Sequence, residues 1–199
     1  MKVSRAQSEE NRQTVIATAS RLFRERGFDG VSLSDLMKAA GLTHGGFYNK
    51  FESKEDLAAQ ACTAALDNSR IKWTRVALKA QADPFASLVR DYLSERHRDN
   101  VGEGCTFASL GTDAMRHGAK LCEVFESEIE AHLDILDNLQ TQEPDEATRD
   151  TSIAALATMV GALLMSRVVT NPALSRRFLE ASAQSIIAGS EEKRTQRKR

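Results

Sequence analysis

Prolines interrupt this chain at only three places, and a polar turn accompanies each of them: Asp83-Pro84, Thr141–Pro144 and Asn171-Pro172. The stretches between them are rich in alanine, leucine, glutamate and arginine, and the 199 residues contain 11 glycines. Long segments of strong helix formers with few breakers predict helices. Because no alternating strand pattern and no internal repeat is present, we expect an all-helical protein large enough to bury a substantial core.

Capping signals and apolar residues at helical spacing predict about nine helices. Ser8 and Gly27 bound the first, and Ser32 with Asp35 forms a capping box for a short second helix that ends at Gly41. The remaining helices are expected over residues 43–51, 53–79, 84–93, part of 101–118, 120–140, a stretch with an apolar middle at 153–169, and 172–189.

Cysteine usage and hydropathy indicate the compartment. Three cysteines (Cys62, Cys105, Cys122) cannot all pair within one chain, which argues against a secreted disulfide framework. No uninterrupted apolar run approaches the roughly 20 residues that cross a bilayer, and the N-terminus lacks the apolar stretch of a signal peptide. We therefore expect a cytoplasmic protein with no membrane partner.

The formal net charge of −1 hides an uneven distribution of charge along the chain. Residues 1–54 carry nine basic and six acidic side chains, whereas residues 55–190 carry 13 and 20. The tail, residues 191–199, carries five and two, and is expected to be disordered. A polyanion such as nucleic acid would therefore bind the ends of the chain rather than its acidic body.

The first three predicted helices form a helix-turn-helix, with a tight turn at Gly41. The third one, Thr43–Phe51, contains the adjacent Gly45 and Gly46, each of which costs about 1 kcal/mol relative to alanine inside a helix. Glycines let a backbone approach a partner closely, and a major groove about 12 Å wide admits a helix. Polar side chains are available to reach DNA, and two aromatic ones are expected to anchor the helix in the core: His44, Tyr48, Asn49 and Lys50, and Phe47 and Phe51.

Residues 12–57 resemble the DNA-binding domain of the TetR (tetracycline repressor-like) family of bacterial regulators. The matching positions are Ala19, Leu22-Phe23, Gly27-Phe28, Val31-Ser32-Leu33, Leu36, Ala39-Ala40-Gly41-Leu42-Thr43, Gly45, Phe47-Tyr48, Phe51, Ser53-Lys54 and Leu57. The resemblance implies a helix-turn-helix domain over residues 1–52 and an effector-binding and dimerisation domain over 53–190. It also implies a homodimer on a DNA operator, released by an unknown small-molecule effector, with no cofactor.

The resemblance assigns roles by position within the first domain. Phosphate contacts fall to Thr14, Ser32, Thr43, Tyr48 and Lys54, and groove contacts to His44, Gly45, Gly46 and Asn49, with Lys50 available for either. Many relatives carry lysine, arginine or proline where this chain has His44, so the preferred base sequence stays open. The two-fold dimer would present two recognition elements to a palindromic site.

The helix around residues 153–169 is apolar on almost every side, which is unusual for the surface of a monomer. Paired with the last helix, it could close a four-helix bundle with a second subunit. The predicted interface comprises Leu156, Val160, Leu163, Leu164, Phe178 and Ile186. The alternative is burial of these side chains within one domain.

Effector chemistry is less evident from the sequence. An apolar pocket could be lined by Trp73, Tyr92, Cys105, Phe107, Met115, Phe125 and Met159, although such residues at helical spacing also suit a plain core. The segment from Gly104-Cys105 to Asp113 resembles a TetR subgroup in which some members sense electrophiles or oxidants through a cysteine. A reactive Cys105 would need a cationic neighbour such as Arg116 or His117; otherwise it is an inert buried thiol.

Two rival classes remain. A metalloenzyme could use Glu128 and His132, four residues apart, with His97 and His117, but the chain lacks the His-Glu-x-x-His and Cys-x-x-Cys motifs. A helical interaction protein without DNA binding is the other. The sequence favours a non-enzymatic DNA-binding transcriptional regulator, a repressor in particular.

Overall fold

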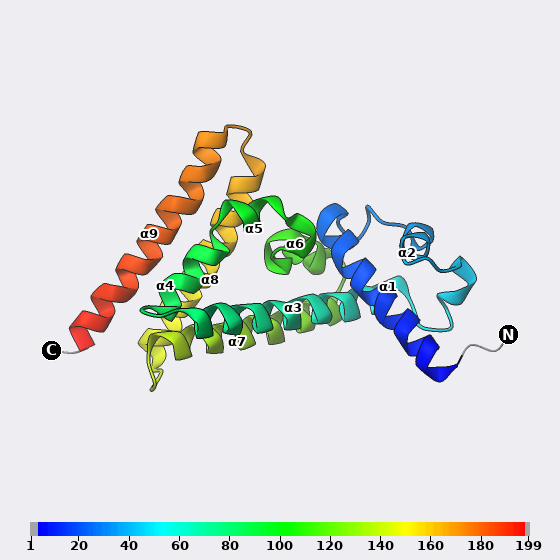
Figure 1. Ribbon diagram of the computed structural model, residues 1–199, viewed down its shortest axis with the longest axis horizontal. Helices are drawn as coiled ribbons and strands as arrows, with labels where there is room; N and C mark the ends of the chain where they lie inside the picture. The colour runs from blue at the N-terminus through cyan, green and yellow to red at the C-terminus, as the bar shows by residue number, and fades with distance from the viewer. Residues whose placement is uncertain (1–3, 198–199) are drawn as a thin grey trace. The chain divides into compact units, whose positions relative to one another are not determined.

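The computed structural model describes residues 4–197, which are helical with no strand among them (Figure 1). The predicted all-helical fold is confirmed, with nine α-helices in this part of the chain. The elements are α1 (Arg5–Arg26), α2 (Leu33–Ala39), η1 (a 3-10 helix, His44–Gly46), α3 (Lys54–Lys79), α4 (Pro84–Tyr92), α5 (Glu95–Asp99), η2 (a 3-10 helix, Val101–Glu103), α6 (Thr106–Arg116), α7 (Ala119–Gln140), α8 (Glu146–Val168) and α9 (Pro172–Arg197).

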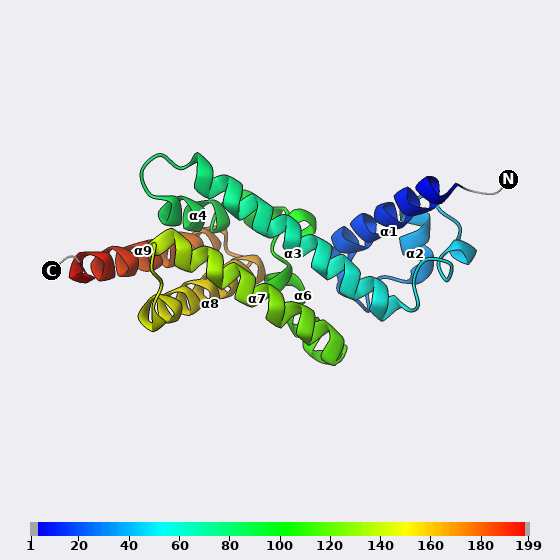
Figure 2. The ribbon, with the colours of Figure 1, turned by 90° about the horizontal axis from the view of Figure 1, so that it is seen from below.

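The chain divides into two compact units. Unit 1 comprises the chain up to Asn68 together with Val101–Ser127, and unit 2 comprises Ser69–Asn100 together with the chain from Glu128 onward. The long helices α3 and α7 contribute to both units and lie side by side within each (Figures 1 and 2). The predicted boundary between residues 52 and 53 stays a prediction, since it marks the end of the helix-turn-helix rather than a division of contacts.

Unit 1 forms around the apolar side of α1. Helix α1 begins one turn earlier than predicted, because Ser4 rather than Ser8 accepts the capping hydrogen bond, from the Gln7 amide at 3.1 Å. It ends at Gly27, whose φ of +74° favours glycine. The predicted capping box of α2 is confirmed, with Ser32 Oγ accepting from the Asp35 amide at 3.1 Å. One buried cluster joins these helices to their neighbours, including Val15, Phe23, Phe28, Leu36, Phe47, Phe51, Leu57 and Leu110.

The predicted third helix is wrong. Residues 43–51, which we call the recognition turn, form the single 3-10 turn η1 followed by further turns. The amides of Gly46 and Phe47 donate to carbonyls three residues earlier, at 3.0 and 3.1 Å. Two adjacent glycines lower the helix propensity, and nucleating an α-helix over so short a segment is costly. These short-range hydrogen bonds and the burial of Phe47 and Phe51 together shape the turn.

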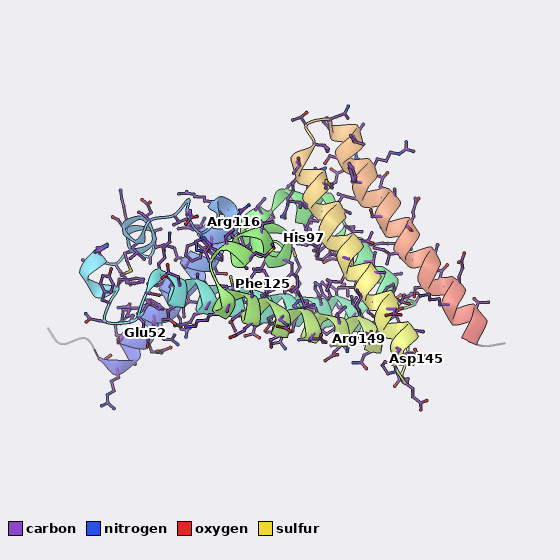
Figure 3. All side chains as sticks on the ribbon, turned by 180° about the vertical axis from the view of Figure 1, so that it is seen from behind. Glu52, His97, Arg116, Phe125, Asp145 and Arg149 are labelled. Carbon is purple, nitrogen blue, oxygen red and sulfur yellow. The ribbon has the colours of Figure 1, made fainter. Side chains whose placement is uncertain are left out.

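Unit 2 contains α4, which starts as predicted: Pro84 lies in its first turn and Asp83 accepts a hydrogen bond from the Ala86 amide at 2.9 Å. The sequence did not predict α5, a short polar helix capped by Ser94. Helices α7 and α8 are joined at Arg149, which contacts Asp134 at 2.6 Å and, at 3.1 Å, the buried Asp137 (Figure 3). Helix α8 packs along α9 (Figures 1 and 2).

The C-terminal segment differs from the prediction of a disordered tail. Helix α9 continues through residues 191–197, where a disordered tail was predicted, because propagating an existing helix needs no new nucleus. Lys198 and Arg199 lie outside the described residues.

Helix α8 is long and apolar enough to cross a membrane by length and composition, although the sequence has no uninterrupted apolar run there. Of its most apolar window, 39% is buried inside the protein. Core helices of soluble proteins share this composition.

Candidate nucleic-acid interface

The recognition turn exposes its polar residues and buries its two phenylalanines. Phe47 is completely buried and Phe51 is 3% exposed, with their ring centroids 5.4 Å apart. Between them Tyr48 is 65% exposed, and its ring meets the edge of Phe47 at 5.2 Å. His44 and Asn49 are also exposed. The phenylalanines therefore hold a polar surface in a fixed place, as a DNA-binding element requires.

The glycines of this turn are not required by the fold around them. A β-carbon added at Gly45 would meet no atom within 4 Å, and one at Gly46 would make ordinary contacts with Met37 at 3.8 Å and Thr43 at 3.9 Å. Neither glycine has a positive φ, unlike Gly27 and Gly41. Since packing and backbone conformation both tolerate a side chain here, the open space beside Gly45 is free for a partner.

All five predicted phosphate-contacting residues are exposed or half-exposed, and three of them, Thr14, Thr43 and Lys54, lie outside the contacts already described. Thr14 and Thr43 are exposed, and Thr43 does not cap the following turn with its hydroxyl. The Thr14 hydroxyl donates to the Glu10 carbonyl at 2.9 Å, which leaves its lone pairs rather than its proton available. Lys54 is half-exposed in the first turn of α3, after the cap Ser53. A cation near the positive end of a helix dipole favours a nearby anion.

Ser32 and Lys50 already have partners within the protein. The Ser32 hydroxyl donates to Asp35 at 2.6 Å while it caps α2. The Lys50 ammonium donates to the carbonyl and hydroxyl of Ser8, at 3.1 and 3.2 Å, and so ties the recognition turn to α1. Sequence patterns could not reveal this contact, because Ser8 and Lys50 are 42 residues apart.

The seven residues predicted to line an effector pocket are divided between the two units. Trp73, Tyr92 and Met159 are buried in unit 2, where Trp73 meets Tyr92 edge-on at 5.8 Å. In unit 1, Phe107 packs on Phe125 at 5.8 Å (Figure 3). Met115 is 76% exposed, so it belongs to no buried lining. A pocket formed by these residues stays a prediction.

Cys105 is buried at the N-cap of α6, where its sulfur accepts a hydrogen bond from the Ala108 amide at 3.4 Å. The two cations proposed for it have other partners, since Arg116 lies 3.5 Å from Asp113 and His117 lies 3.5 Å from Asp29. The cation that interacts electrostatically with Cys105 is instead the buried Arg24, which also faces Cys62. Burial raises the pKa of Cys62 to about 12, which makes that thiol unreactive.

The predicted dimer interface is partly used inside the chain. Leu163 is completely buried and Leu156 is 7% exposed, because both pack within unit 2. Val160, Phe178 and Ile186 are half-buried, whereas Leu164 is 38% exposed. Large apolar side chains that the prediction omitted are exposed on the same two helices, namely Ile153, Met165, Val168 and Leu174. An apolar face of this kind is unusual on a monomer.

The side chains considered as metal ligands already have partners within the protein. His132 is completely buried, with Nδ1 2.6 Å from the Glu128 carbonyl and Nε2 3.2 Å from Ser69 Oγ. The Glu128 carboxylate pairs with Arg70 at 3.2 Å. Within residues 4–197, no group of three or more histidine, cysteine, aspartate or glutamate side chains is placed to hold a metal ion.

Residues 15–61, from α1 through the recognition turn into α3, match the family model described as bacterial regulatory proteins, tetR family. The chain is also 24% identical over 191 residues to the HTH-type transcriptional repressor DhaR of Mycobacterium sp. (strain GP1), a match that covers 90% of this chain and 94% of that protein. Residues 15–61 thus match a domain of the TetR family. The resemblance seen in the sequence is thereby confirmed, and the chain is a transcriptional regulator rather than an enzyme.

Solved structures extend the similarity of fold to both units of this protein. A TetR-family transcriptional regulator from Cytophaga hutchinsonii matches with a TM-score of 0.77 and 23% identity, covering 95% of this chain and 98% of that one. The reduced form of Escherichia coli NemR matches with a TM-score of 0.74 and 18% identity, covering 89% and 95%.

Proposed function

We propose that this regulator is a cytoplasmic repressor that binds a palindromic operator as a homodimer and is released by a small-molecule effector. The observation that carries the DNA contact is the recognition turn, whose exposed polar tip is held by two buried phenylalanines, Phe47 and Phe51. The relative DhaR, named a transcriptional repressor, supports the sign of regulation.

The proposed DNA contacts divide by chemistry. His44, Gly45, Gly46 and Asn49 would face the base edges, because they form the tip of the turn, where Gly46 is half-buried and the other three are exposed. Thr43, Tyr48 and Lys54 would donate to phosphates. Thr14 would do so once its hydroxyl turns away from the Glu10 carbonyl. Ser32 and Lys50 would support the surface from within, since their polar atoms are engaged by Asp35 and Ser8.

The proposed dimer would bury the exposed apolar side chains of α8 and α9, including Leu164 and Val168. Two chains related by a two-fold axis present their recognition turns to two halves of a palindromic site. An effector that binds best when the two turns are misaligned with the operator would lower the affinity for DNA, and DNA would lower its affinity in return.

Binding to the DNA upstream of the protein's own coding region tests the proposal. In fluorescence anisotropy, the wild type is expected to bind that fragment in the presence of excess unrelated DNA. Asn49→Ala is expected to lose about five- to 100-fold of this affinity and to keep its affinity for unrelated DNA, because it removes a base contact. Tyr48→Phe, which removes only a hydroxyl, should weaken binding to both DNAs alike. A wild type that binds no fragment selectively would contradict the proposal.

A thiol-sensing regulator is the second candidate. The observation that favours it is the position of Cys105 at the N-cap of α6, with an electrostatic attraction to the buried Arg24, because a helix N-terminus and a cation both stabilise a thiolate. The similar NemR structure is described as a reduced form.

Alkylation separates the two candidates. In Cys122→Ser, which lacks the exposed thiol, iodoacetamide would modify Cys105 in the native protein and abolish DNA binding if Cys105 is the sensor. An unmodified Cys105 together with DNA binding that survives oxidant would exclude thiol sensing.

A further inference from the structure

Arg24 is a buried cation in the last turn of α1. Its side chain is 6% exposed, and burial lowers the pKa of its guanidinium. Nε donates to the Gly102 carbonyl at 2.7 Å, Nη2 donates to the same carbonyl, and Nη1 donates to Ser20 at 2.9 Å. The nearest paired carboxylate, that of Glu103, is 3.9 Å away and largely exposed. One backbone carbonyl of η2 therefore provides most of the hydrogen bonding that compensates for burying the charge of the guanidinium.

That carbonyl lies where α1 and η2 approach each other closely. A β-carbon added at Gly102 would lie 2.5 Å from a Glu25 carboxylate oxygen and 2.9 Å from Arg21 Cγ, so no larger residue fits without displacing α1 side chains. A buried cation that loses its acceptor strongly destabilises the fold. Consequently, η2 cannot leave α1 unless water or a new partner reaches Arg24.

A second contact holds the same end of α1. Asp113 of α6 accepts a hydrogen bond from the Phe28 amide at 3.1 Å, directly after Gly27 ends α1. Phe28 is buried against Phe23, in the cluster that also contains Phe47 and Phe51. The segment Val101–Arg116 thus contacts the C-terminal end of α1 and the residue after it at two points. The buried cluster connects that end of α1 to the recognition turn.

We infer that Arg24 is a positioning residue for DNA binding: by holding η2 on α1, it keeps the recognition turn in its binding orientation, and displacement of η2 releases DNA. This inference rests on the proposed function, and it assigns the segment Val101–Arg116 as the part of unit 1 through which release is transmitted. Arg24 itself touches no DNA, because its side chain is buried where α1 meets η2.

Three substitutions perturb this contact from both sides. Arg24→Met removes the charge and keeps an apolar side chain in the core, and Arg24→Lys keeps the charge with a single ammonium. Gly102→Ala places a β-carbon in the space of the Glu25 and Arg21 side chains, where η2 meets α1. Arg26→Met is the matched control, because Arg26 is an exposed arginine on the same helix. Far-UV circular dichroism and thermal unfolding establish that each variant is folded at the assay temperature. If Arg24→Met does not fold, Gly102→Ala and Arg24→Lys carry the test.

The first readout is affinity for the upstream DNA fragment. Arg24→Met and Gly102→Ala are each expected to bind at least about tenfold more weakly while fully folded, Arg24→Lys to recover part of the loss, and Arg26→Met to bind within about twofold of the wild type. Because both substitutions break one contact, the double variant should be no weaker than the weaker single variant by more than about twofold. Folded variants that bind like the wild type, or losses that multiply, would overturn the inference.

The second readout needs no DNA and so separates this inference from the proposed function. Amide hydrogen exchange of residues 28–51 in the free protein should be at least about tenfold faster in Arg24→Met and Gly102→Ala than in Arg26→Met. The reason is that η2 no longer holds the C-terminal end of α1. Unchanged exchange would refute the role of the Arg24 contact with η2, even if the wild type binds DNA. A wild type without selective DNA binding would refute the proposed function instead.

Discussion

At Gly45 the position of a β-carbon is surrounded by open space, whereas Phe47, two residues further on, is completely buried. Packing therefore constrains the residue at position 47 but not the residue at position 45. Phe47 fixes where the recognition turn lies, and Gly45 determines how closely its backbone can approach another molecule. A substitution at Gly45 can separate folding from binding, which is rarely possible at a core position.

Gly45→Ala is expected to leave the melting temperature unchanged or to raise it, because replacing glycine at a compatible conformation lowers the entropy of the unfolded chain. Its affinity for the operator should fall about five- to 100-fold, since the new methyl group occupies the space of a base contact. Thermal unfolding and fluorescence anisotropy measure the two effects.

Gly111→Ala is the control, because a β-carbon there also meets nothing within 4 Å and the residue lies in α6, outside the proposed DNA surface. Equal DNA affinity of Gly45→Ala and wild type would show that the duplex does not approach this residue closely.

At the scale of the elements, two buried histidines join the helices of unit 2. His97 of α5 donates from Nδ1 to the Tyr92 carbonyl of α4 at 2.7 Å, and its ring meets Tyr92 at 4.6 Å. His132 of α7 meets Trp73 of α3 at 4.7 Å. Burial lowers the pKa of each histidine to about 4. Both therefore pack as neutral rings at neutral pH.

The pH dependence of unfolding follows from these lowered values. Between pH 6.5 and 4 the unfolded chain binds more protons than the folded one, so the free energy of unfolding falls as the pH falls through this window. Each histidine should contribute about 2 kcal/mol to the loss between pH 7 and pH 5. Urea unfolding at the two pH values measures this loss.

His132→Gln should reduce the pH dependence by about one histidine's share, whereas His44→Gln, at an exposed position, serves as the control. The same difference between pH 7 and pH 5 in His132→Gln and in the wild type would contradict the role of burial.

For the whole molecule, the exposed apolar side chains of α8 and α9 and the exposed recognition turn call for different partners. The apolar face suits a second copy of the chain, and the polar turn suits DNA. Leu78 is a useful contrast, since it is 82% exposed but lies on α3 rather than on α8 or α9, which carry the proposed interface.

Leu164→Asp is expected to raise the dimer dissociation constant at least about 100-fold, because the dimer would bury an unpaired carboxylate. Sedimentation velocity over a range of protein concentrations measures the change. Leu78→Asp, the same substitution at a surface outside the proposed interface, should sediment like the wild type. If Leu164→Asp remains a dimer at low concentration, α8 is not the interface.

Local sequence signals predicted most of the helices and the exposed tip of the site. Ser53, Asp83-Pro84 and Asn171-Pro172 placed helix boundaries correctly, because caps and prolines act within a few residues. The spacing of Phe47 and Phe51 suggested an α-helix, but the glycines between the cap and Phe47 prevented it. The partners of Lys50 and Arg24 lie 42 and 78 residues away, beyond the reach of local patterns.

The anchoring of the recognition turn by Phe47 and Phe51 bears on how such regulators diverge. His44 and Asn49 contribute nothing to the core, so under the proposed function exchanging them would change DNA selectivity without loss of folding. A lineage could thus acquire a new operator through single substitutions at the tip, with every intermediate still folded. Gene duplication followed by such changes would yield paralogues that share one architecture and control different promoters.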